Sequence, residues 1–144
     1  MWIGPGLDSE DLPRLRRAGV RAILSLEQPG DDITPAGLER IRAACALRPA
    51  IAHRNVAIRD YDPEDLVRRL PEALAALGEL HATRRVVYLH CSEGVNRAPS
   101  VALGYVVLTL GEPLDEALAR LRTVHPFARP YDAFVDWLRA QVAR

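Results

Sequence analysis

Apolar residues along the chain fall into two kinds of segment, short runs and longer stretches with helical spacing. The short runs predict strands, and they cover residues 2–3, 20–26, 51–58 and 86–90. The longer stretches repeat apolar residues every three or four positions, which predicts helices over 9–18, 35–45, 63–82, 97–110, 113–124 and from 130 or 131 onward. Strands that alternate with helices favour an α/β fold, with a mostly parallel central sheet of four to five strands flanked by helices.

Length and charge narrow the class of protein. With 144 residues the chain is expected to form one catalytic domain over residues 1–144. Its 19 basic and 19 acidic residues cancel, so neither nucleic acid nor an acidic membrane is expected as a partner. The apolar run 101–110 is too short to span a bilayer, and no signal peptide is expected because no basic stretch precedes an apolar one at the N-terminus.

The cysteines suggest a reducing compartment. Two cysteines, Cys45 and Cys91, are too few for a disulfide framework or a metal cluster, so we expect no bound metal. We expect a cytoplasmic location, because a catalytic thiolate suits a reducing compartment. Cys45 lies on the expected inner face of its helix and should be a core residue. A resolving disulfide with Cys91 is the alternative. We expect the protein to be a monomer.

The segment from His90 to Ser100 carries the candidate chemistry, because it joins an apolar strand to an apolar helix. A loop beneath a helix N-terminus points backbone N–H groups inward, and with the helix dipole these bind an anion such as phosphate. The same field should keep Cys91 as a thiolate. Gly94 permits a backbone that a side chain would obstruct, and the planar Arg97 can hold two phosphate oxygens. A nucleophile and a phosphate clamp on one loop indicate phosphoryl transfer through cysteine.

This segment resembles the signature HCxxGxxR of the cysteine-dependent protein tyrosine phosphatases, particularly the small dual-specificity phosphatases. The residues that match are His90, Cys91, Gly94 and Arg97. The resemblance implies a dual-specificity phosphatase fold and a metal-independent hydrolase, without a cofactor, that works through a cysteinyl-phosphate. It also implies that His90 supports the loop by hydrogen bonds to backbone carbonyls. The implied phosphate-binding loop comprises Cys91, Ser92, Glu93, Gly94, Val95, Asn96 and Arg97.

A phosphatase of this kind needs an acid that protonates the leaving oxygen. Asp60 and Asp62 follow the expected strand 51–58, so they should lie at the same edge of the sheet as Cys91. Asp62 precedes a proline and two acids, where its carboxylate should cap a helix, so Asp60 is preferred. The resemblance agrees, because these phosphatases carry their acid between a strand and a helix. The other histidines show no ligand spacing and are expected to be incidental: His53, His81 and His125.

One position departs from the family pattern. The family commonly has Ser or Thr directly after the arginine, where the hydroxyl assists departure of the thiolate, and here that residue is Ala98. Hydrolysis of the cysteinyl-phosphate should therefore be slower, unless Ser92 takes over the role. Ser100 is expected to project elsewhere on the helix. The sequence Arg97-Ala98-Pro99 also resembles the loop end of plant phosphoglucan phosphatases.

We therefore expect a protein tyrosine or dual-specificity phosphatase, acting on a phosphorylated protein or a small phosphomonoester. The alternatives are a phosphatase for phosphoglucan, a nucleotide or an inositol phosphate, and a phosphate-binding pseudophosphatase. Rhodanese-type sulfur transfer also uses a cysteine beneath a helix, but it does not require an upstream acid. Glu93 in the loop, with no base besides Arg97, disfavours highly charged phosphoinositides.

Overall fold

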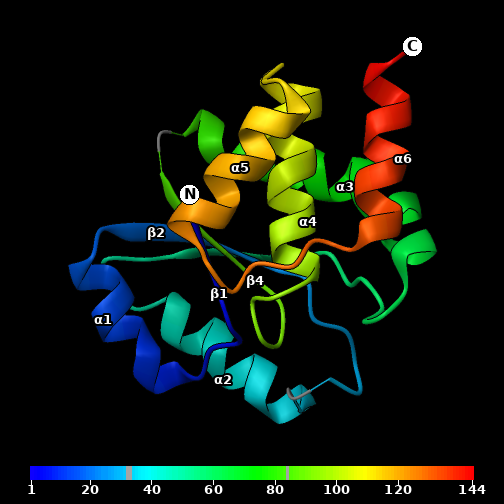
Figure 1. The fold of residues 1–144 in the computed structure, drawn as a ribbon. Helices are drawn as coiled ribbons and strands as arrows, with labels where there is room; N and C mark the ends of the chain where they lie inside the picture. Colours follow the sequence, from blue (N-terminus) through cyan, green and yellow to red (C-terminus); the bar gives the residue numbers. More distant parts are fainter. Residues whose placement is uncertain (32–33, 84) are drawn as a thin grey trace.

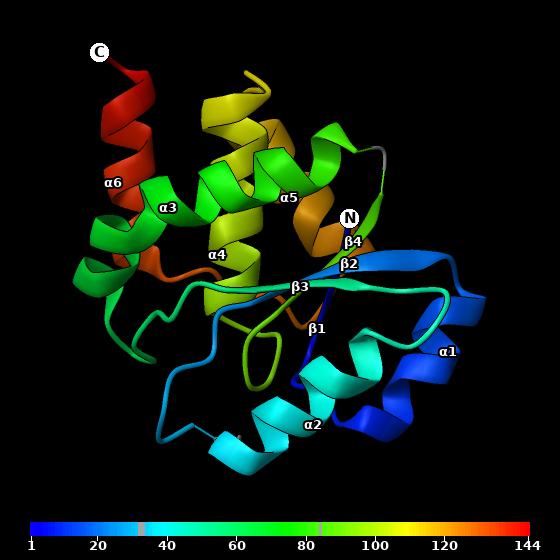
Figure 2. The ribbon, with the colours of Figure 1, turned by 180° about the vertical axis from the view of Figure 1, so that it is seen from behind.

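The computed structural model describes residues 1–31, 34–83 and 85–144, and in these ranges the strands form one sheet between two layers of helices (Figure 1 and Figure 2). The strands are β1 (Trp2–Gly4), β2 (Val20–Ser25), β3 (Ala52–Asn55) and β4 (Val86–His90). Their spatial order is β1-β4-β2-β3, and every pairing between them is parallel. The prediction of a mostly parallel sheet with four to five strands is confirmed.

Helices cover both faces of the sheet (Figure 1). One face carries the 3-10 helix η1 (Ser9–Asp11), α1 (Leu12–Arg17) and α2 (Pro35–Cys45). The other face carries α3 (Pro63–Ala82), α4 (Arg97–Gly104), the π-helical turn η2 (Tyr105–Thr109), α5 (Leu114–Val124) and α6 (Asp132–Val142). Capping side chains begin α2 and α3 as predicted, because Thr34 accepts the N–H of Gly37 and Asp62 accepts the N–H of Asp65.

The two helical layers enclose separate apolar clusters. The larger lies against α3–α6 and includes Leu77, Leu89 and Phe134, whereas the smaller lies against α1 and α2 and includes Leu12, Ile41 and Cys45. Cys45 is therefore a core residue, as predicted, and burial raises the pKa of its thiol. Cys91 belongs to the larger cluster, and both cysteines are free, so the structure does not support a disulfide between them.

Three expected elements differ from those observed. The helix expected over 9–18 is divided into the 3-10 helix η1 and the short helix α1. The strand expected over 51–58 covers only Ala52–Asn55, because its partner β2 ends at Ser25, although the N–H groups of Val56 and Ile58 still donate to residues 25 and 26. The helix expected over 97–110 changes from α-helical to π-helical at Tyr105. The candidate residues still follow the carboxyl ends of their strands, because Asp60 lies beyond the end of β3 and Cys91 directly follows β4.

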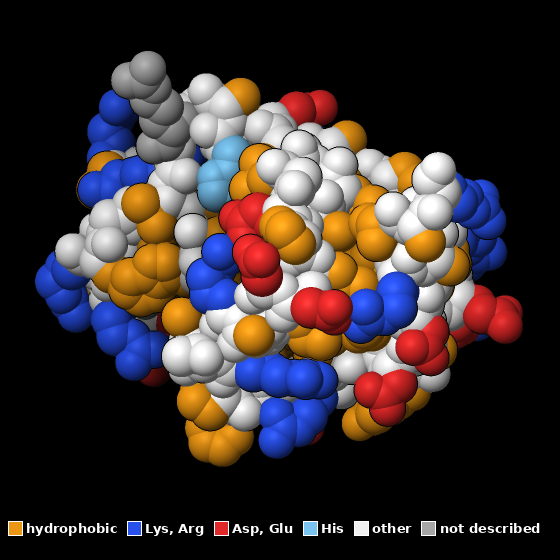
Figure 3. Space-filling view, turned by 45° about the horizontal axis from the view of Figure 1, so that its top comes forward, with side chains coloured by type: hydrophobic (Ala, Val, Ile, Leu, Met, Phe, Trp, Pro, Cys, Tyr) orange, Lys and Arg blue, Asp and Glu red, His pale blue; other side chains and the backbone are white. Residues whose placement is uncertain are grey.

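The parallel sheet places the carboxyl ends of β2, β3 and β4 at one edge, where the loops after them meet (Figure 1). Within the described ranges, no helix combines the length and apolar character needed to cross a membrane. Figure 3 shows arginine and acidic side chains interspersed on one face of the molecule, in keeping with the formal net charge of zero.

Candidate active site

The phosphate loop, residues 91–97, begins where β4 ends and closes at the first turn of α4. Gly94 lies in this loop with a φ of 74°, and a Cβ there would come within 2.6 Å of the carbonyl carbon of Gly4. The loop is therefore folded tightly against β1, and only glycine combines that φ with that space. The N–H of Gly6 donates to the carbonyl of Ser92 over 2.8 Å and ties the same two segments together.

Cys91 and Arg97, the ends of the loop, are both withdrawn from solvent. Cys91 is 3% exposed and Arg97 is 1% exposed. Burial alone would lower the pKa of Arg97, but the charge and hydrogen bond of Asp31 outweigh it, and Asp60 and Cys91 add to the increase. The guanidinium therefore stays cationic and lies within electrostatic reach of the Cys91 sulfur.

Arg97 connects the loops that follow β2, β3 and β4. Its Nη1 lies 2.7 Å from Oδ2 of Asp31 and donates to the carbonyl of Ile58 over 2.8 Å. Its Nη2 donates to Oγ of Ser92 over 3.0 Å and lies 3.3 Å from Oδ2 of Asp60. Nε of Arg97 is buried, and none of the described residues accepts from it. A buried donor without an acceptor is unusual in folded proteins, and an oxygen of an anion held in the loop would supply the acceptor.

Asp60 and Asp62 take the separate places that the sequence predicted. Asp60 is 29% exposed at its side chain and faces Arg97, whereas Oδ1 of Asp62 accepts the N–H of Asp65 and caps α3. We call residues 59–62 the acid loop. Its other end is held by Asp65, whose Oδ2 accepts the N–H of Arg59 over 2.7 Å, and this hydrogen bond is the main cause of a lowered pKa for Asp65.

His90 contacts the phosphate loop from the strand side, where the resemblance placed a loop-supporting residue. Its Nδ1 lies 3.1 Å from the carbonyl oxygen of Cys91 and 3.6 Å from Oε1 of Glu27, and all three residues are buried. Glu27 was not among the predicted site residues. It stands just beyond the end of β2, and the same rule that placed Asp60 at the sheet edge would have drawn attention to it and to Asp31.

The connector between α5 and α6, residues 125–131, also holds the phosphate loop. Nε2 of His125 lies 3.1 Å from the carbonyl of Gly94, the N–H of Arg129 donates to the carbonyl of Val95 over 2.7 Å, and Nδ2 of Asn96 donates to the carbonyl of Arg129 over 2.8 Å. The expectation that His125 is incidental is therefore wrong. No local pattern reveals this contact, because it depends on how α5 and α6 pack around α4.

The other histidines lie apart from these contacts. His53 is on β3, where burial is the main cause that lowers its pKa to about 4. His81 stacks against the ring of Tyr105, with centroids 5.5 Å apart. Ala98 is fully buried, and Oγ of Ser100 accepts the N–H of Tyr131, so Ser100 does project away from the loop, as expected. Among the described residues, no group of three or more His, Cys, Asp and Glu side chains could hold a metal ion.

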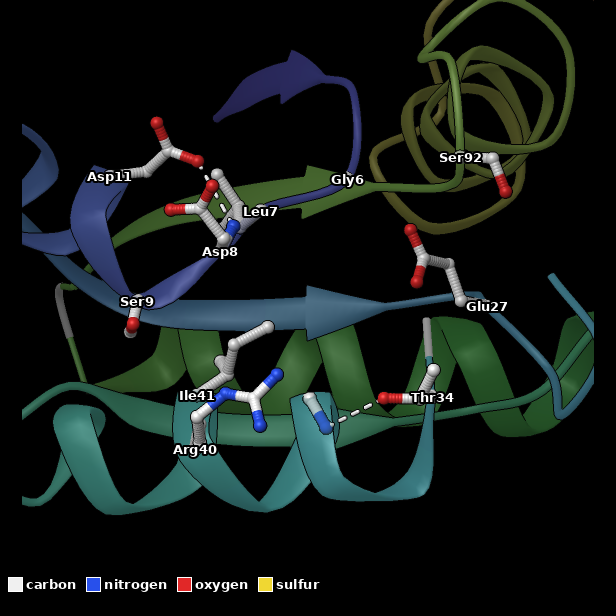
Figure 4. Close-up of a pocket in the computed structure, with 11 residues that line it drawn as sticks. Gly6, Leu7, Asp8, Ser9, Asp11, Glu27, Thr34, Arg40, Ile41 and Ser92 are labelled. Atoms are coloured by element: carbon white, nitrogen blue, oxygen red, sulfur yellow. Dashed lines mark hydrogen bonds between the residues drawn. The ribbon is translucent and has the colours of Figure 1, made fainter. Parts of the chain in front are cut away.

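A cavity of about 460 Å³ adjoins the phosphate loop on the side of α2 (Figure 4). Ser92 lines it from the loop, Glu27 points into it from the end of β2, and Arg40 reaches it from α2. Cys91 and Arg97 are not among the residues that line it. The cavity therefore lies beside Cys91 and Arg97 and not over them.

The chain is similar in sequence to known phosphatases. The chain is 36% identical over 110 residues to the amyloplastic phosphoglucan phosphatase DSP4 of Castanea sativa, which is 75% of this chain and 29% of that protein. It is 32% identical over 138 residues to the dual specificity protein phosphatase Mpk3 of Drosophila melanogaster, covering 96% of this chain and 31% of that protein. The chain spans about a third of the length of the curated relatives it matches.

Solved structures share the fold. The human tyrosine phosphatase-like serine/threonine/tyrosine-interacting protein superposes with a TM-score of 0.76 at 20% identity, covering 98% of this chain and 89% of that one. Human DUSP28 superposes with a TM-score of 0.72 at 23% identity, covering 96% of this chain and 88% of that one. Residues 39–143 match the family described as dual specificity phosphatase, catalytic domain. The resemblance seen in the sequence is thus confirmed, and the chain belongs to the dual specificity phosphatase catalytic-domain family.

Proposed function

We propose that the protein is a metal-independent phosphomonoester hydrolase of the protein tyrosine or dual-specificity type, acting through a cysteinyl-phosphate. One observation carries the proposal: Asp60, from the loop after β3, lies 3.3 Å from Arg97, which ends the same short loop that Cys91 begins. A nucleophile, a phosphate clamp and an acid are then within one site, and each is supplied by the chain itself.

In the first step, the Cys91 thiolate attacks phosphorus and the bond from phosphorus to the leaving oxygen breaks. Asp60 gives its proton to that oxygen, so a neutral alcohol or phenol departs. The backbone N–H groups of the loop and the guanidinium of Arg97 stabilise the charge on the other phosphoryl oxygens. The buried Nε of Arg97, which has no acceptor among the described residues, supports this role because a phosphoryl oxygen would satisfy it.

In the second step, water attacks the cysteinyl-phosphate, the Asp60 carboxylate takes the proton from that water, and the phosphorus–sulfur bond breaks to release phosphate. Ala98 cannot assist the departing thiolate with a hydroxyl. Ser92 has its Oγ 3.0 Å from Nη2 of Arg97, inside the loop, which supports it as the residue that replaces the missing hydroxyl.

The proposed substrate is a phosphorylated protein, as for the dual specificity phosphatases that this chain resembles. The second candidate is phosphoglucan, favoured by 36% identity to a phosphoglucan phosphatase together with the sequence Arg97-Ala98-Pro99. We further propose one catalytic domain over residues 1–144 that acts as a monomer in the cytoplasm, without nucleic acid or membrane partners. Light scattering at micromolar concentration tests the monomer.

The test is hydrolysis of an aryl phosphate in the presence of a chelator, by the wild-type protein and Cys91→Ser. We expect activity that vanadate blocks and that Cys91→Ser lacks. An inactive wild-type protein that still binds vanadate would favour the phosphate-binding pseudophosphatase instead, and dependence on added metal would contradict the proposal. Comparing kcat/KM for phosphotyrosine peptides, phosphoserine peptides and phosphorylated amylopectin then separates the protein and glucan candidates.

A further inference from the structure

Tyr131, the last residue of the connector, touches the acid loop from the far end of the chain. Its Oη lies 3.0 Å from Oδ1 of Asp60 and 2.9 Å from the backbone nitrogen of Tyr61. In Figure 1 the connector crosses in front of the lower end of α4 and leads into the start of α6, and Figure 2 shows the same region from behind. No sequence pattern pairs Tyr131 with Asp60.

The direction of these hydrogen bonds follows from the donors available. The amide of Tyr61 can only donate, so the hydroxyl of Tyr131 accepts from it and gives its single hydrogen to Oδ1 of Asp60. The Tyr61 amide also lies 3.0 Å from Oδ1 of Asp60. Burial, with the nearby charge of Asp60, raises the pKa of Tyr131, so the hydroxyl remains a donor across the neutral range.

These contacts make the two carboxylate oxygens of Asp60 unequal. Oδ1 has two donors, Tyr131 and the amide of Tyr61, whereas Oδ2 faces Nη2 of Arg97 over 3.3 Å. A carboxylic acid that protonates a leaving group must present its proton-bearing oxygen to the reaction site. Because Tyr131 and the Tyr61 amide hold Oδ1, Oδ2 is the oxygen on the side of Arg97 and the phosphate loop.

Tyr131 is itself anchored to the element that carries Arg97. Its backbone N–H donates to Oγ of Ser100, which is fully buried in α4, three residues after Arg97. Two residues earlier, the N–H of Arg129 donates to the carbonyl of Val95. The hydroxyl that contacts Asp60 is thus fixed relative to the phosphate loop, whereas Arg59 and Tyr61 of the acid loop are exposed.

We propose that Tyr131 is a positioning residue for Asp60: its hydroxyl holds Oδ1, so that Oδ2 is aimed at the leaving oxygen of a phosphomonoester bound at Cys91 and Arg97. The inference rests on the proposed function. It assigns a role to a residue outside the sequence signature, and it predicts an effect that depends on the leaving group, because an acid matters most when the leaving oxygen is strongly basic.

The experiment measures kcat/KM for aryl phosphates whose phenols range from acidic to weakly acidic, using wild type, Tyr131→Phe, Asp60→Asn and the double variant. Tyr131→Phe should lower kcat/KM about tenfold for the poorest leaving groups, as expected for loss of a hydrogen bond to a charged group. It should have little effect on the best ones. The double variant should match Asp60→Asn alone, because the hydroxyl acts only through that carboxylate.

The matched control is Tyr88→Phe. Tyr88 belongs to the apolar cluster on the opposite face of the sheet, and its hydroxyl donates to the carbonyl of Pro5. The variant should leave the dependence on leaving group unchanged. A uniform loss across the series for Tyr131→Phe, or additive losses in the double variant, would overturn the inference while leaving Cys91-dependent hydrolysis intact.

A crystal structure of Tyr131→Phe tests the geometry without relying on activity. We expect the Asp60 carboxylate to rotate or to occupy several conformations, and a carboxylate that stays in place would refute the inference. Inactivity of the wild-type protein would instead count against the proposed function, so the two failures are distinguishable.

Discussion

The phosphate loop and the acid loop meet at Arg97, yet they are held in different ways. The phosphate loop lies under β1 and the connector, and its Gly94 leaves no room for a Cβ beside Gly4. The acid loop is half-exposed at Asp60, and its Tyr61 is 77% exposed with a φ of 56°. One loop is fixed by close backbone packing, whereas the other depends on a few side-chain hydrogen bonds.

This difference indicates that the two loops have separate functions. A rigid, buried loop can preorganise donors for a phosphoryl group that every substrate shares. A loop held by few contacts can adjust to leaving groups that vary between substrates. Changes in the phosphate loop should therefore affect all substrates alike, whereas changes in the acid loop should scale with the basicity of the leaving oxygen.

Arg97→Lys should have the largest effect, because Arg97 ends the phosphate loop and also contacts Asp60 in the acid loop. Lysine keeps the charge but loses the planar fork that contacts Asp31, Ser92 and Asp60. We expect kcat/KM to fall on the order of 10²–10³-fold for good and poor leaving groups alike. The surface variant Arg139→Lys, paired with Asp115, is the control. Activity above a tenth of wild type would show that the fork is dispensable.

Asp60→Asn should have the next largest effect, and it tests the contribution of the acid loop alone. Loss of the proton donor should reduce kcat/KM about a hundredfold for poor leaving groups and far less for good ones. Asp62→Asn is a matched control, because Asp62 caps α3 two residues away. If Asp62→Asn showed the stronger dependence on leaving group, the acid would have to be reassigned to it.

Comparing Gly94→Ala with Gly111→Ala separates the destabilisation caused by close packing from that caused by backbone strain. Gly94 and Gly111 have φ values of 74° and 76°, but a Cβ at Gly111 would meet no atom within 4 Å. Gly111→Ala should cost about 1–2 kcal/mol of unfolding free energy from the left-handed backbone alone. Gly94→Ala should cost clearly more and should reduce hydrolysis of every substrate. Equal unfolding midpoints in urea would mean that β1 does not restrict the loop.

His125→Phe is the smallest test and concerns the connector. The variant keeps a ring but loses the contact between Nε2 and the carbonyl of Gly94, which is worth about 1 kcal/mol. We expect a loss of a few-fold in kcat/KM, the same for each leaving group, measured on the aryl phosphate series. His81→Phe, stacked on Tyr105 away from the loop, should change nothing. A loss restricted to poor leaving groups would place His125 with the acid loop instead.

The sequence was most informative where function depends on neighbours in the chain. The loop from Cys91 to Arg97, the cap at Asp62 and the order of strands and helices all follow from local spacing, and the fold confirms the cap and the sheet. Asp60 could be chosen over Asp62 because a cap before proline has a recognisable sequence.

Contacts between distant segments left no such pattern. His125 and Tyr131 reach the site through the packing of α5 and α6 around α4. A single histidine or tyrosine in a connector looks the same whether it faces solvent or a catalytic loop. The end of β3 was overestimated for a similar reason, since pairing depends on where its partner strand stops.

The placement of the two cysteines determines how this protein would respond to peroxide. Cys91, as the proposed nucleophile, is open to oxidation to a sulfenic acid, and many redox-regulated enzymes protect that state by forming a disulfide with a neighbouring thiol. Here the second thiol is packed beneath the opposite face of the sheet. Cys45 is therefore not placed to trap the sulfenic acid as a disulfide, so further oxidation of Cys91 competes with capping by an outside thiol such as glutathione.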